Sequence, residues 1–314
     1  MRLFREMQAS LPDSKVEKAT AVLAANGKSF AFAGKLLDTA TLFACARLYR
    51  FCRYVDDVAD EATDPVKAAR QLASIKHDLV RQKSHDPLVS DFILLARDYA
   101  LDVAVVNELL DGIASDLGHV LVQSDAELLR YCYRVAGTVG VLMCNIFNVR
   151  SPAALAHAID LGIAMQLTNI CRDVVEDAKN GRRYIPADMI GDLSPKQILA
   201  PCSAERTVMS EAVRKLLSRA DHYYQSGAQG YWFLPARIRF AIAVAARVYR
   251  EIGTALRARG LDLWGVRAYV KTPRKYMLAL AALWSLVKAR RTRVDVSHNT
   301  VLHQSLEGLP YANS

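Results

Sequence analysis

The last six residues of the segment 49–61 contain four carboxylates, at Asp56, Asp57, Asp60 and Glu61. Asp56 and Asp60 are four residues apart, so a helix places them on one face, and Asp57 lies one turn before Glu61. Like charges at this spacing repel each other, so a helix that keeps them should gain something in return. Hard divalent cations prefer carboxylate oxygens, and the segment therefore predicts a metal-binding function.

A second polar stripe follows about 110 residues later, at Gln166, Asn169, Asp173 and Asp177. These residues step by three, four and four, so their oxygen-bearing side chains line one face of a helix whose other faces are apolar. A polar stripe on such a helix is more typical of a wet cavity than of a dry core. Two stripes that face each other could hold a small cluster of Mg²⁺ ions and leave coordination positions for phosphate oxygens.

Spacing alone does not establish this reading, because an Asp followed four residues later by another Asp occurs five times in the chain. Asp64 precedes a proline and suits a helix cap, whereas other pairs straddle a helix junction or flank a glycine in a loop. For any isolated pair, a solvated helix face is the alternative to a metal site. The five pairs are 56/60, 60/64, 98/102, 173/177 and 188/192.

Cationic side chains accompany both stripes. Arginine suits bidentate contact with phosphate, although each arginine could equally be the ion-pair partner of a nearby carboxylate. Lys28 and Ser29 begin another predicted helix, whose free amide groups could bind an anion. Carboxylates, carboxamides and cations together indicate a metal-bridged diphosphate. The arginines close to the stripes are Arg53, Arg172, Arg182 and Arg183.

The elements that must position these residues are helices. Long stretches without proline show apolar residues at three- and four-residue spacing, and β-hairpin patterns are nearly absent. The capping pattern at Ser124 and Glu127 and the prolines after Ser151 and Thr272 indicate helix starts. We therefore expect one all-α helical bundle around a core, with no separate second domain. The predicted helices cover residues 13–25, 28–36, 38–62, 65–83, 87–122 with a break, 124–148, 151–179, 203–228, 235–259 and 272–290.

Composition limits the class of protein. The chain has 314 residues, of which 52% are hydrophobic, and this excludes a disordered or collagen-like chain. The six cysteines form no CxxC pair, so they read as reduced core residues of a cytoplasmic protein. The charged N-terminus does not resemble a signal peptide, and the most apolar stretch, 276–287, is too short to cross a bilayer.

Positive charge gathers toward the C-terminus. The net charge is +9, and the residues from Leu263 onward carry eight basic side chains against two acidic ones. Such a region suits an anionic ligand, a membrane surface or nucleic acid, or it is simply a solvated basic face. The sequence shows no recognition helix and no aromatic–basic platform, so nucleic acid is not expected as a partner. We expect a catalytic domain of residues 1–290, followed by a basic, flexible tail of residues 291–314.

Several of these stretches resemble the head-to-head prenyl synthases, the family of squalene and phytoene synthases, and its bacterial phytoene synthases in particular. The resemblance extends over most of the chain, in the right order, and leaves out only the first dozen residues and those after about 290. It implies the all-α isoprenoid synthase fold, with the two acidic segments on opposite walls of a central cavity. The matching segments are GKSFAF at 27–32, the acidic segment 49–61, YCYRVAGTVG at 131–140, residues 166–177, GRRYIP at 181–186 and VYREIG at 248–253.

The resemblance also implies roles for individual residues. The first metal-binding pair would be Asp56 and Asp60, and the second set Asn169, Asp173 and Asp177, with Mg²⁺ as the cofactor and Mn²⁺ as a substitute. Without the resemblance, the tyrosines would read as core residues. Diphosphate would be bound by Lys28, Ser29, Arg53, Arg172, Arg182, Tyr184 and Arg267, and the residues nearest the reacting carbons would be Tyr49, Arg53, Tyr131, Arg172 and Tyr249.

The activity implied is the condensation of two geranylgeranyl diphosphates to 15-cis-phytoene in carotenoid biosynthesis, through a cyclopropylcarbinyl diphosphate. Alternatives within the family are squalene, dehydrosqualene or hydroxysqualene synthases, which use farnesyl diphosphate. An alternative of another class is a non-catalytic isoprenoid-binding or assembly protein. We expect a monomer or weak homodimer, in the cytoplasm or peripheral on the inner face of an anionic membrane, where the basic C-terminal region could contact lipid.

Overall fold

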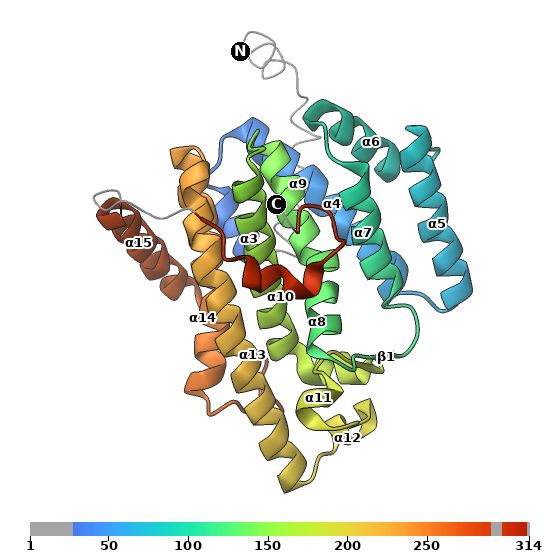
Figure 1. The fold of residues 1–314 in the computed structure, drawn as a ribbon, viewed down its shortest axis with the longest axis vertical. Coiled ribbons are helices and arrows are strands. Elements are labelled where there is room, and N and C mark those ends of the chain that lie inside the picture. Colours follow the sequence, from blue (N-terminus) through green and yellow to red (C-terminus); the bar gives the residue numbers. More distant parts are fainter. Residues whose placement is uncertain (1–27, 290–296, 313–314) are drawn as a thin grey trace.

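The computed structural model describes residues 28–289 and 297–312, and within these ranges the chain is almost entirely helical (Figure 1). The all-α prediction is therefore confirmed. The helices are α3 (Lys28–Gly34), α4 (Thr39–Asp60), α5 (Pro65–Arg81), α6 (Pro87–Tyr99), α7 (Val103–Ala114), α8 (Asp125–Cys132), α9 (Thr138–Ile146), α10 (Pro152–Lys179), α11 (Ala187–Ile190), α12 (Pro195–Leu199), α13 (Ser203–Gln229), α14 (Ala236–Ala258) and α15 (Thr272–Ala289).

Short polar side chains start several of these helices, as their positions in the sequence suggested. Asp64 accepts hydrogen bonds from the amides of the first turn of α5, and Asp102 does the same for α7 after the break expected within 87–122. Ser124 accepts from the Glu127 amide at the start of α8. Ser151 precedes α10 without a side-chain cap, so there Pro152 alone supplies the start signal. The helix predicted at 13–25 lies outside the described residues.

The predicted helix 124–148 is interrupted. Residues Tyr133–Gly137 form a π-helical turn, η1, between α8 and α9. Such turns are frequent at functional sites because they rotate the side chains that follow. Here the turn brings Val135 and Ala136 to the cavity described below.

Two short strands were not predicted. Val120–Leu121 (β1) pairs in parallel with Arg182–Arg183 (β2). Each strand has two residues, too few for an alternating pattern to be detected in the sequence. The pairing places Arg182 beside the acidic stripe of α10, where it lines the polar pocket described below.

Helix α10 is the centre of the bundle and packs against α9, α13, α14 and η1 (Figure 1). Glycines permit its close approach to its neighbours. A Cβ atom on Gly140 would lie 2.3 Å from the Ala158 carbonyl oxygen, and one on Gly162 would lie 2.3 Å from the Ala136 oxygen. Among the described residues α10 is also the one helix long and apolar enough to cross a membrane, but 72% of its apolar window is buried in the bundle.

The cysteines are free, as expected, and four of them are buried; Cys52 is half-buried and Cys202 is exposed. Burial raises the pKa of the Cys45 thiol to about 12, so this thiol stays protonated at neutral pH. The buried cysteines act as small apolar core residues.

The C-terminal segment differs from the flexible tail predicted for 291–314. Residues 297–312 lie across α8 and α10 and contain a 3₁₀ helix, η3 (Thr300–Leu306) (Figure 1). Leu306, Leu309 and Ala312 are buried, and Tyr133 and Tyr223 donate hydrogen bonds to backbone oxygens of this segment. Within 297–312 the apolar residues are few and follow no regular spacing, so the sequence did not predict that this segment packs on the bundle.

Replacing Gly162 tests how tightly α10 is packed. Gly162→Ala should lower the free energy of unfolding by roughly 1–3 kcal/mol, because a backbone carbonyl must move to admit the methyl group. Urea denaturation followed by circular dichroism measures the change. Gly253→Ala is the matched control: its Cβ would meet the flexible side chain of Leu217 at 3.0 Å, so we expect little loss. Equal losses in both variants would contradict this account.

Candidate active site

The two acidic stripes face each other across a polar pocket of about 310 Å³. One wall is the C-terminal half of α4 and the other is the C-terminal half of α10, as the sequence predicted. The loop after α7 and strand β2 contribute further residues. The charged and polar lining residues are Arg53, Asp56, Asp60, Asp116, Tyr131, Gln166, Asn169, Arg172, Asp173, Asp177, Arg182 and Tyr184.

Asp56 and Asp177 hold their protons unusually strongly. Burial and the nearby Asp60 carboxylate raise the pKa of Asp56 to about 7. Burial and the nearby Asp173 carboxylate raise the pKa of Asp177 to about 7. Each wall therefore holds a carboxylate whose negative charge lacks full compensation from the described side chains. A cation in the pocket would relieve this repulsion.

Asp173 is compensated instead by two arginines. Its two oxygens accept a pair of hydrogen bonds from the guanidinium group of Arg172. They accept a second pair from Arg267, with nitrogen–oxygen distances of 2.7 and 2.9 Å. Burial alone would raise the pKa of Asp173, but the two guanidinium groups outweigh it and lower the pKa. Asp173 also has non-helical backbone angles (φ −106°, ψ 15°), which kink α10 at this point.

Arg182 links the two walls. Its guanidinium contacts Asp60 of α4 at 2.7 Å and the Asp116 carbonyl oxygen at 3.2 Å. Arg53 pairs within α4 with Asp57. Arg183, in contrast, is buried and donates to the Val122 and Ile185 carbonyl oxygens, so it stabilises the loop and does not reach the pocket.

Asp116 was missed by the sequence analysis. It accepts hydrogen bonds from the Tyr131 hydroxyl at 2.9 Å and the Tyr184 hydroxyl at 2.6 Å, and the two rings stack with centroids 4.7 Å apart. Burial raises the pKa of Asp116 despite these bonds. A single Asp after a helix carries no periodic signal, and only the fold brings it to residues of two distant motifs.

A larger apolar cavity of about 410 Å³ opens from the polar pocket, and the two share Asp56, Val135, Gln166 and Asn169 as lining residues. It extends along α10 from Asn169 to Ala154, which is about 22 Å at the rise of an α-helix. Tyr49 and Tyr249 line it, and burial raises the pKa of Tyr249 to about 12. The site thus joins a charged pocket to a long apolar channel.

The remaining predicted residues lie at the edges. Arg267 is exposed and reaches the site through Asp173. Lys28 and Ser29 begin α3, but their side chains are outside the described part of the structure.

The donor set fits a hard divalent cation. Among the described residues, the buried Asn169 Oδ1 has no hydrogen-bond partner, while its Nδ2 donates to Gln166. Asp56 and Asp177 add carboxylate oxygens that repel their neighbours in the absence of a cation. Oxygen ligands in this number and charge are those that Mg²⁺ prefers.

Comparison with known proteins places this geometry in a family. Residues 23–275 match the squalene/phytoene synthase family. The chain belongs to the squalene/phytoene synthase family. A 15-cis-phytoene synthase of Enterobacter agglomerans is 38% identical over 279 residues, which cover 85% of this chain and 94% of the relative. A phytoene synthase of Pseudescherichia vulneris is 35% identical over 89% of this chain and 94% of its own length.

Solved structures agree with the family. A crystal structure of a dehydrosqualene synthase in complex with a ligand superposes with a TM-score of 0.78, at 26% identity, over 88% of this chain and 98% of that chain. The isoprenoid synthase fold that the sequence implied is thereby confirmed.

Changing Asp56 to its neutral isostere should stabilise the metal-free protein. The folded-state pKa of about 7 lies above the unfolded value of 3.8, so Asp56 costs stability as pH rises from about 4 to 7, and the full cost persists above pH 7. Asp56→Asn should therefore raise the free energy of unfolding at pH 8 by on the order of 2–4 kcal/mol, and much less at pH 4. Urea denaturation in a chelator at both pH values measures this.

Asp98→Asn is the control, because Asp98 is an exposed residue of α6 outside the site. Its stability should match that of the unchanged chain at both pH values. A destabilised Asp56→Asn protein at pH 8 would contradict the repulsion inferred for α4.

Proposed function

We propose that this chain is a 15-cis-phytoene synthase, which joins two geranylgeranyl diphosphates head to head. The observation that carries the proposal is the continuity of the acidic, arginine-lined pocket with the apolar channel along α10. This shape fits a substrate with a diphosphate at one end and a long hydrocarbon chain at the other. The 35–38% identity to curated phytoene synthases supports the choice of substrate.

The acidic residues of both walls would hold the cofactor. Asp56 and Asp60 on α4 and Asn169, Asp173 and Asp177 on α10 are the proposed ligands of Mg²⁺, for which Mn²⁺ could substitute. When bound, the metal would supply positive charge that favours departure of the diphosphate. Asp173 would give up one of its arginine contacts in order to bind the metal.

The arginines then become available to the substrate. Arg172 and Arg267 are held by Asp173, and Arg182 by Asp60, so each already points at the position where anionic oxygens would arrive. Together with Arg53, Tyr184, Lys28 and Ser29 they would bind the two diphosphates. Guanidinium groups suit this role because they contact phosphate in a bidentate manner.

The reaction follows from charge stabilisation and positioning. The C1–O bond of one substrate breaks, the double bond of the second attacks the allylic cation, and loss of a proton leaves a cyclopropylcarbinyl diphosphate. A second ionisation, rearrangement and proton loss give the linear product, with no hydride donor. Tyr49, Tyr131 and Tyr249 present aromatic faces that can stabilise the cations.

The tyrosines are poor candidates for the base. Burial raises the pKa of Tyr49, Tyr131 and Tyr249, so their phenols keep their protons at neutral pH and have little tendency to form phenolates. The released diphosphate, held in the adjoining pocket, is the better proton acceptor. The tyrosines would orient and shield the cation from water.

Product analysis with Asp60→Asn tests the function. Purified protein with Mg²⁺ and geranylgeranyl diphosphate should yield a forty-carbon hydrocarbon and diphosphate, identified by mass spectrometry. Asp60→Asn should lower the rate by at least 100-fold with little loss of stability, because Asp60 is partly exposed. Asp98→Asn should keep full activity.

Two results would overturn the assignment. Thirty-carbon products from farnesyl diphosphate alone would favour a squalene, dehydrosqualene or hydroxysqualene synthase. Substrate binding without any Mg²⁺-dependent diphosphate release would favour a non-catalytic isoprenoid-binding protein.

A peripheral membrane contact is the second part of the proposal. Helix α15 packs on α14 through Leu278 and Ala282, yet large apolar residues on its other face are exposed. An apolar helix face near basic residues is typical of a membrane-surface helix. The hydrocarbon product is insoluble in water, and such a contact would let it pass from the apolar channel into lipid. The exposed residues are Tyr276, Met277, Leu280, Leu283, Trp284 and Val287.

Liposome co-sedimentation tests this contact. The protein should bind vesicles with anionic lipid, and binding should weaken with salt and in Trp284→Ser. Val80→Ser is the control, because Val80 is exposed on α5. The basic C-terminal region that could contact lipid includes Lys288, Arg290, Arg291 and Arg293, of which the three arginines lie outside the described residues. Replacing all four with Gln should also weaken binding, at about 1 kcal/mol for each residue near the surface. Equal binding to neutral vesicles, or none, would contradict the proposal.

A further inference from the structure

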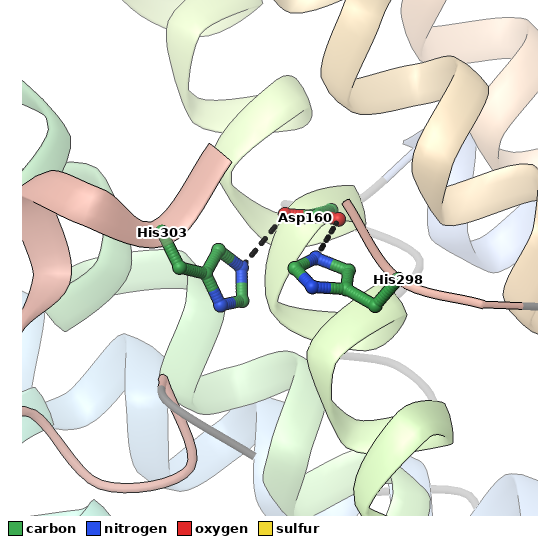
Figure 2. A group of neighbouring side chains, drawn as sticks. All are labelled: Asp160, His298 and His303. Carbon is green, nitrogen blue, oxygen red and sulfur yellow. Dashed lines mark hydrogen bonds and ion pairs between the residues drawn. The ribbon is translucent and has the colours of Figure 1, made fainter. Parts of the chain in front are cut away.

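A second cluster of potential ligands lies outside the active site, between α10 and the C-terminal segment (Figure 2). Asp160 is fully buried on α10, while His298 and His303 come from the segment that crosses it. His303 Nε2 lies 2.9 Å from Asp160 Oδ1, and His298 Nε2 lies 2.9 Å from Asp160 Oδ2. Each of these three residues offers one ligand atom, and the three atoms all lie within 4.8 Å of one another.

The hydrogen bonds of His303 fix its tautomer. Its Nδ1 lies 2.7 Å from the Ala312 carbonyl oxygen, which can only accept, so Nδ1 carries a proton. Its Nε2 faces a carboxylate oxygen, which also accepts when ionised. A proton or a metal ion must therefore lie between Nε2 and Asp160, and a proton there belongs either to the ring or to the carboxyl group.

We propose that Asp160, His298 and His303 bind a Zn²⁺ ion. Two imidazole nitrogens and one carboxylate oxygen are typical zinc ligands, whereas Mg²⁺ favours oxygen alone. A histidine whose Nδ1–H is held by a backbone carbonyl is the usual arrangement for a metal ligand, because the bond orients Nε2 toward the ion. Ser226, which donates to Asp160 and contacts His157 at 3.1 Å, offers a further oxygen.

The geometry requires only a small expansion. Ligand atoms of a tetrahedral zinc site are about 3.3 Å apart when each bond is about 2.0 Å long. The two present nitrogen–oxygen distances are each 2.9 Å and are made to different oxygens of Asp160, and the ligand atoms of the three residues lie within 4.8 Å of one another. Small side-chain rotations would bring both nitrogens and one or both oxygens to an ion between them. The side chain of His298 is 6% exposed and that of Asp160 is 0% exposed, so the ion would be enclosed by protein.

This site would be structural and separate from the reaction. Asp160 lies nine residues before Asn169 on α10, about 13 Å along the helix. It would fasten residues 297–312, which follow the part of the chain that matches the family, to the central helix of the bundle. Zinc would thus add a cross-link to the hydrogen bonds that Tyr133 and Tyr223 already donate to this segment.

Zinc analysis of the full-length chain, purified without a histidine tag, tests the proposal. After dialysis against a chelator and addition of ZnSO₄, we expect one equivalent of zinc that survives gel filtration, measured by plasma mass spectrometry. Zinc should raise Tm by several degrees, and X-ray absorption should show two imidazole ligands. The measurements are made in an Asp60→Asn/Asp177→Asn background, which removes two of the active-site carboxylates. Comparison with His298→Ala in the same background separates any zinc that the rest of that pocket retains.

His298→Ala should lose this equivalent and the shift in Tm, and it is the first choice because His298 lies at the edge of the cluster. His303→Gln provides a second variant, and circular dichroism shows whether each remains folded. His77→Ala is the control, because His77 is exposed on α5, and it should bind zinc like the parent. Absence of bound zinc in the parent, or full binding in a folded His298→Ala protein, would overturn the proposal and leave a proton between His303 and Asp160.

Discussion

Repulsion between carboxylates held on two facing helices is the constraint on which the site depends. Asp56 and Asp177 each lie beside another acidic residue in a partly buried pocket, and both have pKa values of about 7. Arginines already pair with Asp60 and Asp173, whereas no ion pair with Asp56 or Asp177 is found among the described residues, so a divalent cation would meet an uncompensated carboxyl group on each wall. The folded protein therefore keeps a carboxylate repulsion in this pocket that a bound cation would relieve.

Helix α10 joins the two parts of the site, because it lines both the polar pocket and the apolar channel. Its C-terminal end carries the polar stripe. Its middle, which includes Leu161 and Gly162, forms a wall of the apolar channel. Close glycine contacts hold it against α9 and η1, and at its kink Asp173 accepts hydrogen bonds from Arg267. A shift in this helix would move the metal ligands and the hydrocarbon wall together.

The pairings between arginines and carboxylates also stabilise the pocket by offsetting part of its negative charge. Arg182 crosses from β2 to Asp60, and Arg267 crosses to Asp173. These guanidinium groups would exchange a carboxylate for a diphosphate when substrate and metal arrive, so little reorganisation is needed. The same arginines thus serve the stability of the free protein and the binding of an anion.

The sequence alone determined the helices, their caps and the two acidic stripes, because these depend on local periodicity and on neighbouring side chains. Asp64 and Asp102 could be placed at or near helix boundaries for that reason, and Asp56 and Asn169 could be placed on the faces that meet. The tertiary structure decided what depends on distant contacts. Asp116 meets Tyr131 and Tyr184 only in the folded chain, and Arg267 reaches Asp173 across 94 residues of sequence. The buried position of His303 and the order of residues 297–312 arise likewise from packing on α8 and α10, which no local pattern encodes.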